Sequence, residues 1–293
     1  MKLSSFDQLS KTISFFENAK LEEKLKYLDE LYGNVKELPF VCGVTGPPGV
    51  GKSTLINHFA SSLAEIFGKV VVFAIDPSSH SCKGSFLGDR VRFVENPKVY
   101  FRSFSTRGLY GGANEVILDS IALCGFANCP IVIVETAGVG QSEVVIREFS
   151  NFVLALLTPV TGDIIQGLKA GLLEVADYVA INRAELGQVD LFEKDIRVAL
   201  GILGRSDVQI GRIDALSGQG VETLVLLIQK LVKSFSPLQK SKLLNLRVCA
   251  LIQGMVGSVL KDVSAIEHTS ISAALRSFSG IFKKQLSNLE VII

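Results

Sequence analysis

The stretch GPPGVGKS, from Gly46 to Ser53, decides the fold of this 293-residue chain. It matches the pattern G-x-x-x-x-G-K-[ST], and it lies between the apolar run Phe40–Thr45 and a helical pattern of apolar residues. In this strand, loop and helix order the glycines let consecutive backbone N–H groups turn inward towards a phosphate. The sequence therefore predicts a phosphate-binding loop (P-loop) that holds a nucleoside triphosphate at the N-terminus of a helix.

The residues of this loop have different expected roles. Lys52 is expected to reach the β- and γ-phosphates, which makes it a predicted catalytic residue, and the Ser53 hydroxyl is expected to ligate Mg²⁺. Thr54 follows on the side of the α-phosphate. The other predicted nucleotide-binding residues of the loop are Gly46, Gly49, Val50 and Gly51.

Short apolar runs alternate with helical patterns after residue 40. Strands that are buried on both faces read as continuous apolar runs, and their alternation with helices is typical of a parallel sheet. We therefore predict an α/β fold of the P-loop NTPase class, with a mostly parallel sheet flanked by helices. The expected strands are Phe40–Thr45, Val70–Ile75, Ile131–Glu135, Phe152–Thr158, Tyr178–Asn182 and Val208–Ile213.

Helical patterns also precede and follow this core. Residues 3–32 place leucines among charged residues at helical spacing, and Pro237 marks a break after the helix expected at Val221–Lys233. We predict an N-terminal helical extension at 1–37, a P-loop domain at 38–236 and a C-terminal helical arm at 237–293. The apolar faces of the arm either pack on the parent domain or form a homodimer.

Composition excludes several classes of partner. The net charge is +1 and the basic residues are dispersed, so we expect no nucleic-acid partner. The amino terminus lacks the apolar region of a signal peptide, and the apolar runs are strand-sized, so we expect a cytoplasmic protein without a membrane partner. The five cysteines include no C-x-x-C pair, which argues against a disulfide framework and a zinc knuckle.

Two acidic residues end expected strands. Asp76 and Glu135 each supply the first charge after an apolar run, and such strand ends face the ligand crevice of an α/β sheet. Mg²⁺ that bridges phosphates needs only one or two carboxylates, so both are predicted outer ligands, although each also fits a solvated strand end. After Glu135, we expect Gly138 to meet the γ-phosphate as part of a switch loop and Gln141 to orient the attacking water.

Further motifs lie along the chain after the P-loop. They are DPSS at 76–79, GSFLGDRVRF at 84–93, GG at 111–112, VETAGVGQSE at 134–143 and TGDIIQGLKAG at 161–171. Over residues 38–232 these motifs resemble one family, the MeaB/ArgK/MMAA GTPases. The resemblance implies a SIMIBI-class GTPase domain that binds GTP or GDP with Mg²⁺, carries helical extensions and forms a homodimer. It also implies a chaperone of cobalamin-dependent methylmalonyl-CoA mutase, in which GTP binding and hydrolysis gate loading and protection of the cofactor.

The resemblance assigns further site residues. Asp89 corresponds to an aspartate of the first switch that organises Mg²⁺ and the attacking water, so it joins Lys52 and Glu135 as a predicted catalytic residue and Ser53, Asp76 and Glu135 as a predicted metal ligand. The third switch corresponds to Thr161–Gly171. Its expected polar residues are Gln166 and Lys169.

The base-recognition motif departs from the NKAD of the family, because it reads Asn182-Arg183-Ala184-Glu185. Guanine offers N1–H and N2–H₂ donors to a carboxylate, and Glu185 still supplies one on a longer arm. A second base loop, Asp214-Ala215-Leu216, is expected to offer guanine O6 a backbone contact at Ala215. Guanine preference is therefore the expectation.

Two other functions fit the same loop. A small-molecule kinase would transfer the phosphoryl group to an acceptor other than water, and a nucleotide-binding module would have lost hydrolysis. For the GTPase we expect a slow intrinsic rate, because no second cation is evident for the transition state.

Overall fold

The computed structural model describes residues 3, 5–19, 21–77, 96–106, 115–136, 142–159, 171–183, 189–234, 240–264 and 271–290. Within these ranges the core is a seven-stranded sheet in the order β3-β2-β4-β1-β5-β6-β7, and each of its strand pairs is parallel. The α/β architecture is confirmed. The strands are β1 Phe40–Thr45, β2 Val70–Pro77, β3 Val99–Thr106, β4 Ile131–Thr136, β5 Phe152–Leu157, β6 Tyr178–Asn182 and β7 Gln209–Ile213.

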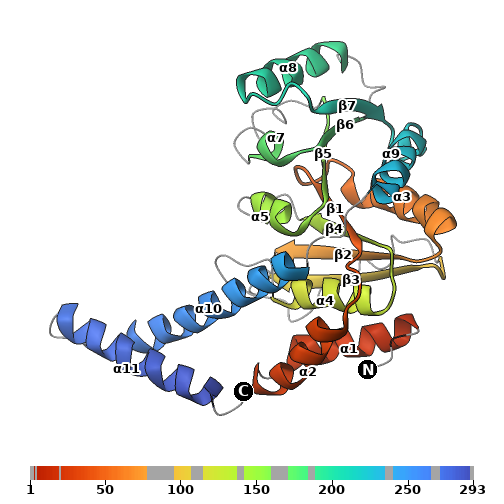
Figure 1. The fold of residues 1–293 in the computed structure, drawn as a ribbon. Helices are drawn as coiled ribbons and strands as arrows, with labels where there is room; N and C mark the ends of the chain where they lie inside the picture. The colour runs from red at the N-terminus through yellow and green to blue at the C-terminus, as the bar shows by residue number, and fades with distance from the viewer. Residues whose placement is uncertain are drawn as a thin grey trace.

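Helices cover both faces of the sheet (Figure 1). Helices α3 and α9 pack on one face of the sheet, and α1, α2, α4 and α5 pack on the other. Helices α7 and α8 pack against β5 and β6. The helices are α1 Phe6–Asn18, α2 Leu21–Asn34, α3 Lys52–Phe67, α4 Glu115–Phe126, α5 Ser142–Phe149, α7 Leu172–Val175, α8 Val189–Ile202, α9 Val221–Lys233, α10 Lys240–Ser264 and α11 Ile271–Glu290.

The edge strand β3 was absent from the sequence prediction. Its residues pair with β2 from Val70↔Val99 onwards, but Arg102 and two serines interrupt the apolar pattern. Arg102 bonds to the Ser14 hydroxyl at 3.1 Å and pairs with Glu17, both on α1. These contacts stabilise a polar residue in β3 and place α1 beside this edge strand of the sheet. A helix beside an edge strand hinders pairing with another chain.

Helix α10 begins against α4 and runs away from the sheet, with α11 beside it (Figure 1). Its stretch Lys242–Ser264 is long and apolar enough, by length and composition, to cross a membrane, and 27% of its most apolar window is buried. The uninterrupted apolar runs of the sequence are strand-sized and did not single out this stretch, in which scattered polar residues leave the average apolar. The domain boundaries at 37 and 236 stay predictions.

Candidate functional site

Two glycines of the P-loop occupy positions that no other residue would fit. Gly46 has φ 150° and Gly51 has φ 102°, values that residues other than glycine rarely adopt. A Cβ atom would also lie 2.2 Å from the Leu156 carbonyl oxygen at Gly46, and 2.5 Å from Asn182 Nδ2 at Gly51. Neighbouring strands therefore hold the loop closely, and its shape requires glycine at both positions.

Lys52 begins α3 and folds back over the loop. Its Nζ donates hydrogen bonds to the carbonyl oxygens of Gly46 at 2.8 Å and Pro47 at 2.9 Å, and the residue is 7% exposed. The ammonium charge is thus held at the loop itself rather than in solvent. The next residues, Ser53 and Thr54, lie in the first turn of α3, where Thr54 is exposed.

The structure brings together two of the predicted metal ligands. Ser53 Oγ donates a hydrogen bond to Glu135 Oε1 at 2.8 Å. Glu135 is buried, and its place is fixed because β4 pairs with β1 in the register Val44↔Glu135. Next to it, the hydroxyl of Thr136 donates to that of Thr45 at 3.0 Å, which ties the ends of the same strands.

This donor set fits Mg²⁺. A hydroxyl and a carboxylate are hard oxygen ligands, and Mg²⁺ commonly takes one or two carboxylates while phosphates and waters complete its shell. In the described part of the chain no group of three or more His, Cys, Asp or Glu residues could hold a metal ion, so an all-protein cage is not formed there. A magnesium site here would depend on the phosphates of a nucleotide.

Other predicted site residues are placed only in part. The backbone of Asp76 lies near the C-terminal end of β2, opposite Ser105, and β2 pairs with β4 in the register Ala74↔Glu135. The same end of the sheet thus carries Asp76 and Glu135, as expected, but the Asp76 side chain lies outside the described part. Also outside the described residues are Asp89, Gly138, Gln141, Gln166, Lys169 and Glu185.

Asn182 links the P-loop to the second base loop. Its Nδ2 donates to the Val50 carbonyl oxygen at 2.7 Å, and its Oδ1 accepts from the Ala215 N–H at 2.9 Å. The side chain is 3% exposed, so both bonds are shielded from water. Three residues that the sequence assigned to nucleotide binding are therefore in direct contact. Sequence reasoning missed this contact, because each residue belongs to a different motif.

The loop after β7 is shaped by its own aspartate. Asp214 accepts from the backbone N–H groups of Leu216 at 2.9 Å and Ser217 at 3.3 Å. Hydrogen bonds from the Ser217 hydroxyl and the Leu216 N–H hold the pKa of the Asp214 carboxyl below its ordinary value. Ala215 is buried, whereas the Leu216 side chain is 82% exposed at the tip of the loop.

A parallel sheet with a glycine loop, a buried lysine and a serine–carboxylate contact at its C-terminal edge defines a P-loop nucleotide-binding protein. A model of the family described as methylmalonyl Co-A mutase-associated GTPase MeaB matches residues 9–262. The chain belongs to this family. The match confirms the resemblance seen in the sequence and extends it beyond 38–232, through α2 and most of α10.

Curated relatives are identical to the chain at more than a third of the aligned positions. It is 38% identical over 203 residues to a mouse protein named methylmalonic aciduria type A homolog, mitochondrial, covering 66% of the chain and 49% of the mouse protein. It is 36% identical over 199 residues to a putative GTPase of Pyrococcus horikoshii, covering 66% of this chain and 62% of that protein. The matched region thus spans between 49% and 62% of the length of these two relatives.

Solved structures agree on the fold. A structure described as LAO/AO transport system kinase has a TM-score of 0.62 at 23% identity, covering 96% of this chain and 94% of that chain. HypB from Helicobacter pylori, solved in complex with nickel, has a TM-score of 0.53 at 16% identity, covering 74% and 98%. At these identities the likeness supports the P-loop NTPase fold alone.

Proposed function

We propose that this protein binds and slowly hydrolyses GTP with Mg²⁺, and that its nucleotide state controls a cobalamin-dependent acyl-CoA mutase such as methylmalonyl-CoA mutase. The observation that carries the GTPase half is the contact of Ser53 with Glu135 at 2.8 Å beside a P-loop whose lysine is held on the loop. Membership of the MeaB family and the name of the mouse relative support the mutase half.

The geometry suggests how each residue acts. Lys52 would exchange its carbonyl partners for oxygens of the β- and γ-phosphates, and Ser53 with Glu135 would hold Mg²⁺. Held by these residues, Mg²⁺ would neutralise charge on the phosphates. Glu135 lies three residues before Gly138 of the predicted switch loop, so a change at the γ-phosphate has a short path into that loop. We expect a slow rate because Lys52 is the only cationic side chain that we assign to the transferred group.

Guanine recognition is assigned to Asn182, Glu185 and the Asp214–Leu216 loop. Asn182 uses one amide hydrogen on Val50 and one lone pair on Ala215, which leaves a second hydrogen and a second lone pair for the base. The Ala215 N–H already donates to Asn182, so guanine O6 would compete with that bond. Glu185 would supply the carboxylate that discriminates guanine from adenine.

A homodimer and a cytoplasmic location complete the proposal. Helices α10 and α11 expose large apolar side chains, a composition that suits a protein interface. Those assigned to this interface are Ile252, Leu260 and Leu275.

Nucleotide turnover tests the GTPase half. Displacement of a fluorescent GDP analogue is expected with GTP and not with ATP, and phosphate release should fall at least about 100-fold in Lys52→Ala, because a charge on the transferred group is lost. Lys98→Ala is a matched control: Lys98 is exposed, pairs with Glu65 and precedes β3, at the opposite end of the strands. Equal release by the wild type and Lys52→Ala, or equal displacement by ATP, contradicts the proposal.

Binding to the mutase is measured separately. Purified methylmalonyl-CoA mutase is expected to co-elute with this chain, and the amount retained should differ between GDP and a non-hydrolysable GTP analogue. Co-elution that ignores the nucleotide, or no co-elution at all, contradicts the mutase assignment and leaves the turnover result standing.

A further inference from the structure

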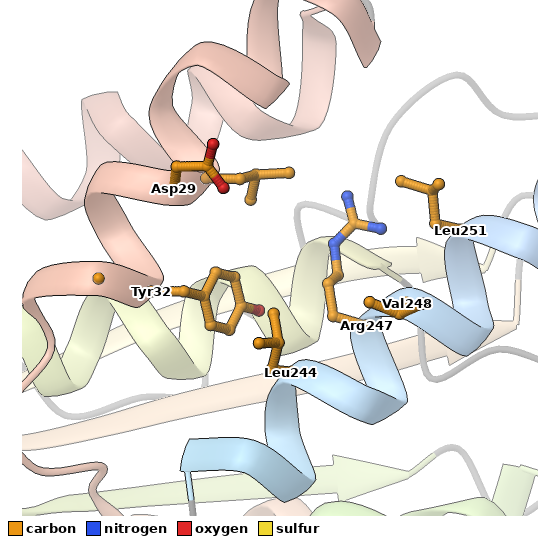
Figure 2. Close-up of a pocket in the computed structure, with 8 residues that line it drawn as sticks. Asp29, Tyr32, Leu244, Arg247, Val248 and Leu251 are labelled. Carbon is orange, nitrogen blue, oxygen red and sulfur yellow. The ribbon is translucent and has the colours of Figure 1, made fainter. Parts of the chain in front are cut away.

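A second pocket lies away from the P-loop, between α2 and α10. Its volume is about 410 Å³, which falls in the range of small-molecule sites. Figure 2 shows α2 on one wall and α10 on the other, with the Arg247 side chain ending between Asp29 and Leu251. The lining is otherwise mostly apolar and comprises Leu28, Asp29, Tyr32, Gly33, Leu244, Arg247, Val248 and Leu251.

Arg247 is the buried polar group of this pocket. It is 3% exposed, and its Nε donates to Asp119 Oδ1 at 2.8 Å on α4. Tyr32 donates to the same oxygen at 3.1 Å. Nη1 lies 3.2 Å from Glu115 Oε2, yet within the described residues neither Nη1 nor Nη2 has a hydrogen-bond partner. Nη1 thus has an ion pair with Glu115 but no hydrogen bond, and in the same described part of the chain Nη2 and Asp119 Oδ2 have no hydrogen-bond partner either. Such buried polar atoms are costly unless a partner fills the site.

The charges around Arg247 indicate the kind of partner. A guanidinium keeps its proton in proteins, and its planar pair of Nη groups matches the two oxygens of a carboxylate. Asp119 and Glu115, which is 33% exposed, are balanced by Arg247 and Lys24, so these four groups together carry no net charge. Asp29 adds a negative charge to the pocket wall, but its side chain is exposed and water screens it.

We propose that this pocket binds a small monocarboxylic acid, with its carboxylate on the Nη groups of Arg247 and its apolar chain against the leucines and valine of α2 and α10. Burial of the chain supplies most of the affinity, and the bidentate contact selects the carboxylate over a neutral head group.

Calorimetric titration of the full chain with octanoate tests this assignment. Saturable binding is expected, at least about tenfold tighter than for octanamide or 1-octanol, because a charge-assisted pair is lost with the neutral ligands. Asp29→Asn should tighten octanoate binding by about two- to fivefold, since it removes a screened like charge. Octanoate binding no tighter than that of 1-octanol, or no saturation at millimolar concentration, overturns the proposal.

Two variants on α10 locate the site. Val248→Phe places a ring in the pocket from a half-exposed position and should abolish octanoate binding, whereas Leu260→Phe adds the same ring to the same helix outside the pocket lining and should leave binding unchanged. Equal losses in both variants overturn the assignment. Sedimentation of the same samples is a further check: if Val248→Phe converts a dimer to a monomer and octanoate does the same, the pocket is an interface between copies and the proposal is wrong.

Discussion

The edge of the sheet at the P-loop and the junction of α2, α4 and α10 both hold charged residues away from water, but in different ways. At the P-loop, Lys52 donates hydrogen bonds to backbone carbonyl oxygens, and Ser53 donates one to Glu135. At the junction, the Arg247 side chain pairs with Asp119, which is fully buried. Phosphate can replace carbonyl partners without breaking the fold, whereas the buried pair holds separate helices together. The comparison shows that the P-loop contacts can be exchanged for contacts to a ligand, whereas the Arg247–Asp119 pair attaches α10 to α4.

The largest expected effect on stability comes from breaking the Arg247–Asp119 pair. Arg247→Leu should lower the free energy of unfolding by about 3–5 kcal/mol, because it leaves the buried Asp119 carboxylate without its cation. Urea unfolding measures this change. Arg212→Leu is the matched control, since Arg212 is half-exposed and water screens its pairs with Asp190 and Glu193, so their loss should change stability little.

The double variant Arg247→Leu with Asp119→Leu sharpens this prediction. Apolar groups of similar size avoid the cost of unpaired charges, so most of the lost stability should return. A loss for Arg247→Leu no greater than that for Arg212→Leu would show that the junction does not depend on the buried pair.

The next effect concerns the link between the two nucleotide loops. Asn182→Ala should lower the free energy of unfolding by about 2–4 kcal/mol, because it leaves the buried Val50 carbonyl and Ala215 N–H without partners. GDP affinity should fall in parallel. Asn18→Ala on α1 removes one exposed side-chain bond, to the Ser14 carbonyl, and serves as the control. Unchanged GDP affinity in Asn182→Ala would mean that the loops bind nucleotide independently.

A pair of glycines separates strain from close contact. Gly51→Ala and Gly68→Ala both place a side chain at positive φ, so each should cost about 1 kcal/mol of stability. Only the Cβ at Gly51 meets Asn182 Nδ2, at 2.5 Å, whereas at Gly68 nothing lies within 4 Å. Gly51→Ala should therefore lose additional stability and weaken GDP binding at least about tenfold. Similar GDP affinities in the two variants would refute the close contact.

The smallest effect is a pH dependence at Asp214. Its folded-state pKa is lowered by hydrogen bonds from Ser217 and Leu216, so its stabilising contribution is complete above the unfolded pKa and is lost as the pH falls through the folded pKa. Unfolding curves of the wild type and Asp214→Asn should differ slightly at pH 7, and the difference should begin to shrink as the pH falls below about 4. If the wild type instead became increasingly more stable than Asp214→Asn towards acid pH, the lowered pKa of Asp214 would be contradicted.

Much of the fold could be predicted because its signals are local. Apolar runs gave six of the seven described strands, and the glycines, Lys52 and Ser53 gave the P-loop. The strand β3 was missed because its stability depends on α1, which lies far away in sequence. The Arg247–Asp119 pair joins residues 128 positions apart, and no motif marks either one. Local patterns predict elements and motifs, whereas contacts between distant elements appear only after the chain is folded.

The Asn182 side chain has a consequence for the thermodynamics of ligand binding. One amide orders the loop for the phosphates and the loop assigned to the base, so a ligand that orders one loop lowers the entropy cost of ordering the other. The binding free energies of guanosine and of pyrophosphate should then not sum to that of the intact nucleotide. Each half should bind more tightly when the other half is already in place, which makes the covalent nucleotide a better ligand than its parts.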